Sequence, residues 1–227
     1  MAELIVALDL ASRAEAERLV ERLGDETDFY KIGYQLFYGG DGLALGRELM
    51  AAGKRVFFDL KLLDIPNTIS HGVAAIAGTG ATMLTVHAYP QAMRAAAEAA
   101  AGSGLTLLGV SVLTSMDTAD LAAAHYDLAP RDLVRLRAMD AMKAGMGGLV
   151  CAPAEVDAAR AATRAGFAIV TPGIRPAGAD SGDQKRAATP AAAVADGATH
   201  LVVGRPITAA PDPKAAAKAI RAEMLGR

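Results

Sequence analysis

The chain has 227 residues and a formal net charge of −2, a length that suits one α/β barrel, since such barrels start near ~200 residues. Its composition, 52% hydrophobic and 21% charged, allows a sizeable core and excludes a largely disordered chain. The balanced charge excludes a general attraction to nucleic acid or to anionic membranes. One cysteine, Cys151, excludes an intrachain disulfide. No apolar run reaches the ~18 residues of a membrane span, and we expect a cytoplasmic protein.

Short apolar runs alternate with helical stretches along the whole chain. The expected strands are residues 4–8, 29–32, 56–60, 82–86, 105–110, 148–150, 167–170 and 200–203. Helix starts fit between them, because Ser12 and Glu15 form a capping box and prolines favour the first helical turn at Pro66, Pro90, Pro130, Pro153, Pro190 and Pro213. This alternation predicts a (β/α)8 TIM barrel in a single domain over residues 1–227, with an open doubly wound sheet as the alternative.

The third expected strand ends in charged residues. Because side chains alternate along a strand, Asp59 and Lys61 should point to one side and Phe58, Leu60 and Leu62 to the other. Parallel α/β folds bind their ligands beyond the carboxyl ends of the strands. The pattern therefore predicts a carboxylate and an ammonium group side by side in an active site, and a surface salt bridge is the alternative.

The connections after the last two strands suit an anionic ligand. Residues 172–189 form a long segment rich in glycine, proline and polar groups, which is typical of a lid. After the eighth strand, Gly204 would let backbone N–H groups approach an anion and Arg205 could bind it bidentately. These two loops often build phosphate sites in barrels. The alternative for Arg205 is an ion pair at the barrel rim.

The stretch from Asp59 to Thr68, with the pattern D-x-K-x-x-D-I-P-N-T, resembles the signature of the orotidine 5'-monophosphate decarboxylases, of the bacterial type. Further fragments agree in order and spacing along nearly the whole chain, at residues 6–9, 30–33, 112–115, 171–175, 183–186 and 203–206. The resemblance implies decarboxylation of a nucleotide monophosphate, orotidine 5'-monophosphate, to UMP in pyrimidine biosynthesis, with no cofactor.

The resemblance also implies roles for individual residues. The catalytic array would be Lys31, Asp59, Lys61 and Asp64, in which Lys61 protonates the C6 carbanion and Asp59 lies near the departing carboxylate. The enzyme would be a homodimer in which Asp64 and Thr68 reach the partner's site. The substrate-binding residues would be Asp9, Lys31 and Thr68 at the ribose, Thr114 or Ser115 at the pyrimidine, and Pro172, Arg175, Gln184, Gly204 and Arg205 at the lid and phosphate.

Two other functions stay open. Relatives of the same barrel superfamily share D-x-K-x-x-D but act with magnesium as sugar-phosphate decarboxylases or aldolases, and they usually carry an acidic residue where this chain has Lys31. A nucleotide-binding protein without activity is the second alternative, which four alternating charges in a dry pocket disfavour. The histidines, four in all, lack metal-ligand spacing, and we expect no metal site.

Overall fold

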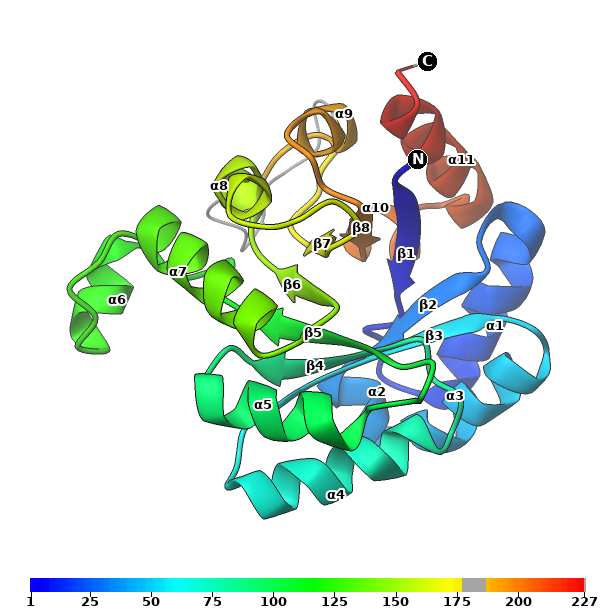
Figure 1. Ribbon diagram of the computed structural model, residues 1–227. Helices are drawn as coiled ribbons and strands as arrows, with labels where there is room; N and C mark the ends of the chain where they lie inside the picture. The colour runs from blue at the N-terminus through cyan, green and yellow to red at the C-terminus, as the bar shows by residue number, and fades with distance from the viewer. Residues whose placement is uncertain (177–186, 227) are drawn as a thin grey trace.

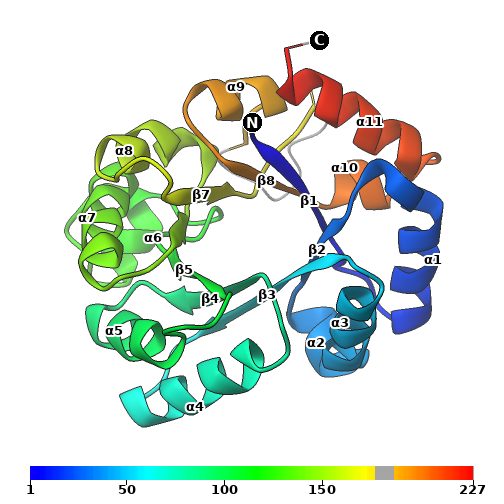
Figure 2. The same cartoon turned by 45° about the vertical axis from the view of Figure 1, so that its right-hand side comes forward.

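Eight parallel strands close into a barrel in chain order in the computed structural model, which describes residues 1–176 and 187–226. Figure 2 shows the strands as an inner ring with the helices around it. The predicted TIM barrel is confirmed. The strands are β1 (Glu3–Ala7), β2 (Phe29–Ile32), β3 (Arg55–Leu62), β4 (Met83–His87), β5 (Thr106–Val110), β6 (Gly148–Val150), β7 (Ala168–Thr171) and β8 (His200–Val203).

Helices cover the outside of the barrel (Figure 1). They are α1 (Arg13–Leu23), α2 (Tyr34–Gly39), α3 (Gly42–Ala51), α4 (Pro66–Ala77), α5 (Pro90–Ala99), α6 (Thr118–Ala123), α7 (Pro130–Lys143), α8 (Val156–Ala161), α9 (Pro190–Ala195), α10 (Arg205–Thr208) and α11 (Pro213–Met224), with short 3-10 turns η1 (Gly24–Glu26) and η2 (Pro153–Glu155). Within the part of the chain described, no helix is both long and apolar enough to cross a membrane.

The helix starts follow from local chemistry. Ser12 and Glu15 form the predicted capping box at the start of α1, which satisfies N–H groups that the helix itself leaves unpaired. The predicted prolines begin α4, α5, α7, α9 and α11, whereas Pro153 begins the turn η2 and α8 starts three residues later. The sequence did not reveal that the β2–β3 connection is divided into two helices, α2 and α3.

The apolar residues form two layers because strand side chains alternate. Ile5, Phe29 and Phe57 are buried in the cluster inside the barrel. Their neighbours Val6 and Phe58 belong to the larger cluster between the strands and the helices. The interior is thus filled with side chains, as expected for a small barrel.

The third strand departs from the regular extended strand that we expected. Phe58 pairs with Leu84 of β4, and the next registered pair is Leu62 with Val86. Residues 59–61 of β3 therefore lie opposite one residue of β4, Thr85, so β3 carries extra length at its carboxyl end. Bulges of this kind are frequent next to active sites, where they redirect side chains.

Lys61 lies within this bulge and has a φ of 44°, a left-handed conformation that non-glycine residues rarely adopt. The predicted alternation nevertheless holds. Phe58 and Leu60 are buried in the outer cluster and Leu62 packs against it, while Asp59 and Lys61 lie together at the mouth of the barrel.

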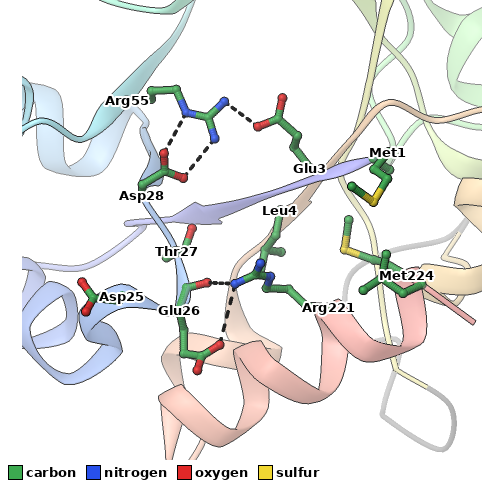
Figure 3. A pocket seen from close by; sticks show the side chains of 12 residues that line it. Met1, Glu3, Leu4, Asp25, Glu26, Thr27, Asp28, Arg55, Arg221 and Met224 are labelled. Atoms are coloured by element: carbon green, nitrogen blue, oxygen red, sulfur yellow. Dashed lines mark hydrogen bonds and ion pairs between the residues drawn. The ribbon is translucent and has the colours of Figure 1, made fainter. Parts of the chain in front are cut away.

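The amino ends of the strands surround a cavity of about 410 Å³ with an ion-pair network (Figure 3). The Arg55 guanidinium at the start of β3 lies 2.5 Å from the Glu3 carboxylate of β1 and 2.9 Å from that of Asp28. Arg221 of α11 donates to the Glu26 carbonyl oxygen at 2.9 Å. These contacts join three strands and the last helix, and this end of such barrels typically serves stability.

Replacing Arg55 by methionine should lower stability without affecting catalysis. The guanidinium pairs with two partly exposed carboxylates and lies over the Phe29 ring at 4.4 Å. We expect a loss of about 1 kcal/mol, since exposed ion pairs are weak singly and gain in networks, and a melting temperature lower by ~2–4 °C. Calorimetry measures the melting temperature, and steady-state kinetics measure kcat. An unchanged melting temperature, or a reduced kcat, would contradict the assignment of stability to the amino ends of the strands and of catalysis to their carboxyl ends.

Candidate active site

The carboxyl ends of the strands surround a second cavity, of about 460 Å³. Its walls carry most of the residues predicted as site residues, and Val110, Val150 and Val202 supply apolar surface between them. The predicted residues that line it are Asp9, Lys31, Asp59, Lys61, Thr114, Pro172, Arg175, Gly204 and Arg205, together with Ser115, the alternative to Thr114. The cavity therefore has a charged side over β1–β3 and a basic side beyond β7 and β8.

Acidic and basic groups alternate along the charged side. The Lys31 ammonium donates to Asp9 Oδ1 at 2.8 Å and lies 3.5 Å from Asp59 Oδ2. Lys61 Nζ lies 2.8 Å from Asp59 Oδ1. Lys31 and Asp59 are the most buried of the four, with side chains 8% and 15% exposed, so their charges are little screened by water. Each inner charge thus has opposite charges on both sides.

Asp59 is kept ionised by these neighbours. Burial by itself would raise the pKa of Asp59, but the charges of Lys31 and Lys61 and the hydrogen bonds from Lys61 and Thr85 outweigh it, and the pKa lies below its ordinary value. Lys61 Nζ also lies 5.3 Å from the centre of the Tyr34 ring, a favourable cation–π distance. Asp59 therefore carries its negative charge at neutral pH.

Gly33, directly after β2, leaves room for the ion pair between Asp9 and Lys31. A Cβ atom at this position would lie 2.9 Å from Asp9 Oδ1 and 2.9 Å from Lys31 Nζ. The backbone of Gly33, with φ −103° and ψ −171°, is open to any residue. Its small size is therefore needed at the site and not for the fold.

Replacing Gly33 by alanine should lower activity without unfolding the protein. The added methyl group would displace the ends of two flexible side chains, and a shift of about 1 Å in a positioned group can cost ~10²-fold in rate. We expect kcat/KM to fall by about that factor while the melting temperature changes little. Gly104→Ala is the matched control, since a Cβ atom there meets nothing within 4 Å. Equal kinetics for the two variants would refute the role of Gly33.

The basic side of the cavity is formed by the segments after β7 and β8. Arg175, Gly204 and Arg205 line it. The N–H of Arg175 donates to the Ala188 carbonyl oxygen at 2.9 Å, and residues 174 and 188 form a bridge, so the two ends of the long 172–189 connection are held together. Gln184, predicted at the phosphate, lies outside the described residues.

Two predicted site residues lie away from this cavity. Asp64 and Thr68 are exposed, and the Asp64 carboxylate accepts a hydrogen bond from the N–H of Ile65 at 2.6 Å. The apolar side chains beside Asp64 are exposed as well, Leu63 at 51% and Ile65 at 65%. A single chain therefore does not bring Asp64 to Lys61.

Comparison with known proteins agrees with this geometry. Residues 2–220 match the family described as Orotidine 5'-phosphate decarboxylase / HUMPS family. The chain belongs to this family. It is 58% identical over 223 residues to the orotidine 5'-phosphate decarboxylase of Rhodopseudomonas palustris (strain BisA53), covering 98% of this chain and 94% of that protein.

Solved structures are similar over almost their whole length. The crystal structure of orotidine 5'-phosphate decarboxylase from Lactobacillus acidophilus superposes with a TM-score of 0.86 at 37% identity and covers 99% of both chains. An uncharacterized conserved protein from Geobacillus kaustophilus reaches a TM-score of 0.84 at 31% identity, over 97% of this chain and 99% of that one.

Three further residues of this site in the orotidine 5'-phosphate decarboxylase family member were not evident from the sequence. Gly33 and Tyr34 follow β2: Gly33 leaves room for Asp9 and Lys31, and the Tyr34 ring lies close to the Lys61 ammonium group. Thr85 is fully buried in β4 and donates to Asp59 Oδ1. A single polar residue inside the apolar run of β4 was the available signal for Thr85, but only the register between β3 and β4 places it beside Asp59.

Proposed function

We propose that this chain decarboxylates orotidine 5'-monophosphate to UMP as a homodimer in the cytoplasm, with Lys61 as the proton donor. The observation that carries this proposal is the alternating array of Asp9, Lys31, Asp59 and Lys61. Its four charges meet in one cavity at the carboxyl ends of three adjacent strands, where barrels of this type perform their chemistry.

The position of Lys31 favours this reaction over a magnesium-dependent one. Its ammonium group lies between the carboxylates of Asp9 and Asp59, at 2.8 and 3.5 Å. A divalent cation would need those carboxylate oxygens as ligands and would be repelled by the ammonium group. The array therefore supports stabilisation of a carbanion by Lys61 rather than of an enediolate by a metal.

The reaction balances with one proton from the protein. The bond from C6 to the carboxylate breaks, carbon dioxide leaves, and the electron pair stays on C6. The Lys61 ammonium stabilises this charge and transfers a proton to C6, after which the neutral amine regains a proton from water. Asp59 fixes the Lys61 ammonium at 2.8 Å and presents negative charge near the departing carboxylate.

The basic side of the cavity supplies binding energy for this step. We assign the substrate phosphate to Arg175, Gly204, Arg205 and Gln184, the pyrimidine edge to Thr114 or Ser115, and the ribose to Asp9 and Lys31. A guanidinium binds a phosphate through two parallel hydrogen bonds. Binding energy from a group remote from C6 can be used to close the site and exclude water, with Pro172 at the start of the closing segment.

The exposed surface around Asp64 supports the homodimer. Leu63 and Ile65, beside Asp64, and Tyr89 and Leu113, after β4 and β5, are all exposed. They follow three consecutive strands, and apolar side chains gathered in this way mark interaction surfaces. A second chain on this surface would bring its Asp64 and Thr68 to the cavity, so that Asp64 becomes the outer carboxylate beside Lys61 and Thr68 contacts the ribose.

The direct test follows the ultraviolet absorbance of orotidine 5'-monophosphate with purified protein and excess EDTA. We expect conversion to UMP that EDTA does not affect, because Lys31 and Lys61 take the place of a metal. The proposal would be rejected if conversion required added magnesium, or if the protein turned over a sugar phosphate and not orotidine 5'-monophosphate. The chain would then be assigned to the magnesium-dependent sugar-phosphate decarboxylases or aldolases.

A further inference from the structure

Thr85 contacts two residues of the charged array, Asp59 and Lys61, with one hydroxyl group. Its Oγ1 donates to Asp59 Oδ1 at 2.9 Å and accepts from the backbone N–H of Lys61 at 2.9 Å. The residue is fully buried in the middle of β4. One side chain of β4 therefore links the carboxylate of Asp59 to the main chain that carries the Lys61 ammonium group.

The irregular pairing of β3 explains why this hydroxyl is needed. Residues 59–61 lie opposite Thr85 alone, because the register changes between Phe58 and Leu62. In a regular ladder, the N–H of Lys61 would donate to a carbonyl oxygen of the neighbouring strand. Here the Thr85 hydroxyl accepts it, which satisfies a partly buried donor that would otherwise be costly.

The same contact supports an uncommon backbone conformation. Lys61 has a φ of 44°, and such conformations persist only where the surroundings fix them. The conformation directs the Lys61 ammonium toward Asp59 Oδ1, which also accepts from Thr85. Asp59 Oδ1 thus accepts from both the Lys61 ammonium group and the Thr85 hydroxyl group. This shared acceptor fixes Lys61 and Asp59 relative to each other.

We propose that Thr85 is a positioning residue for the decarboxylation, which fixes Asp59 and Lys61 relative to each other through its hydroxyl group. The inference rests on the proposed function of the charged array and extends it to a residue that does not line the cavity. The Thr85 hydroxyl proton is donated to Asp59, so Thr85 acts through the two charged residues and not on the substrate directly.

The electrostatics of Asp59 agree with this role. Burial would raise the pKa of Asp59, but the charges of Lys31 of β2 and Lys61 of β3 bring it below its ordinary value. The hydrogen bond from Thr85 lowers this pKa as well. Asp59 in turn acts on His87, at the end of β4, and on Tyr34, after β2. Loss of the Thr85 hydroxyl removes a donor to the ionised form, so the pKa of Asp59 should rise.

The test compares Thr85→Val with Thr85→Ser in the full-length protein. Valine keeps the shape without the hydroxyl, and serine keeps the hydroxyl. We expect the valine variant to lose about 10- to 100-fold in kcat with a much smaller change in KM, since a positioned group has moved. The acid limb of its kcat–pH profile should move to higher pH, while the serine variant stays close to wild type in both.

Thr106→Val is the matched control, because it removes a hydroxyl group at the amino end of the adjacent strand β5. If Thr85→Val does not fold, the comparison of Thr85→Ala with Thr85→Ser measures the effect of the hydroxyl group in the same way. The inference would be overturned if the variant without the hydroxyl kept the wild-type kcat and the wild-type acid limb of the pH profile. It would also be overturned if the serine variant lost as much kcat as the variant without the hydroxyl. Wild-type protein that leaves orotidine 5'-monophosphate unchanged would instead reject the proposed function itself.

Discussion

Replacing Lys61 by methionine is expected to lower kcat by at least about 10⁴-fold, because in the proposed mechanism this one side chain supplies both the proton and a preorganised charge. A positioned acid typically contributes ~10²–10⁴-fold, and one preorganised electrostatic group ~10²–10³-fold. Methionine keeps much of the length of the side chain without its ammonium group. Asp59 still has Lys31 at 3.5 Å and Thr85 at 2.9 Å, so we expect the variant to fold.

The loss should be specific to this lysine. Lys54→Met removes an ammonium group next to the amino end of the same strand, at the end of the barrel opposite Asp59 and Lys61, and should leave kcat unchanged. Absorbance assays compare kcat of the wild type with that of both variants. Melting temperatures show whether each variant is folded. A Lys61→Met variant that retains a substantial part of the activity would remove Lys61 from the centre of the mechanism.

Hybrid dimers of two inactive variants should recover activity. In the proposed homodimer, Lys61→Met would disable the site in its own chain, and Asp64→Asn would disable the site in the partner, with a loss of ~10²–10³-fold for one electrostatic group. A hybrid of the two variants then contains one doubly altered site and one intact site. Coexpression with two different tags allows it to be purified, and we expect about half of the wild-type activity per dimer.

A second hybrid serves as the control. Asp59 and Lys61 belong to the same chain and lie 2.8 Å apart, so a hybrid of Asp59→Asn with Lys61→Met has one altered residue in each site and should stay inactive. Recovery in the first hybrid and none in the second would support a site shared between subunits. No recovery in the first would mean that Asp64 acts within its own chain or not at all.

The sequence was sufficient to predict the barrel because the strand and helix signals are local. The period of the apolar runs and the first-turn prolines locate the eight strands and most helix starts. The grouping of Asp9, Lys31, Asp59 and Lys61 in one cavity was also predictable, since each follows or ends a parallel strand whose carboxyl end opens on the same side.

Long-range geometry was not predictable in the same way. The bulge in β3 depends on how β3 and β4 pair, so neither the φ of Lys61 nor the contact with Thr85 could be inferred from the order of residues. The proximity of Gly33 to Asp9 likewise arises from the packing of two strands. The positions of Asp64 and Thr68 relative to a cavity depend on a second chain, and their roles stay predictions.

The ion pairs at the base of the barrel have a consequence for how this enzyme can change during evolution. Glu3, Arg55 and Asp28 fasten the amino ends of three strands, and the opposite ends of those strands hold Asp9, Lys31 and Asp59. Selection for resistance to heat can therefore act on one set of residues while selection for turnover acts on the other. Adaptation to a new temperature need not alter the charges of the proposed catalytic array.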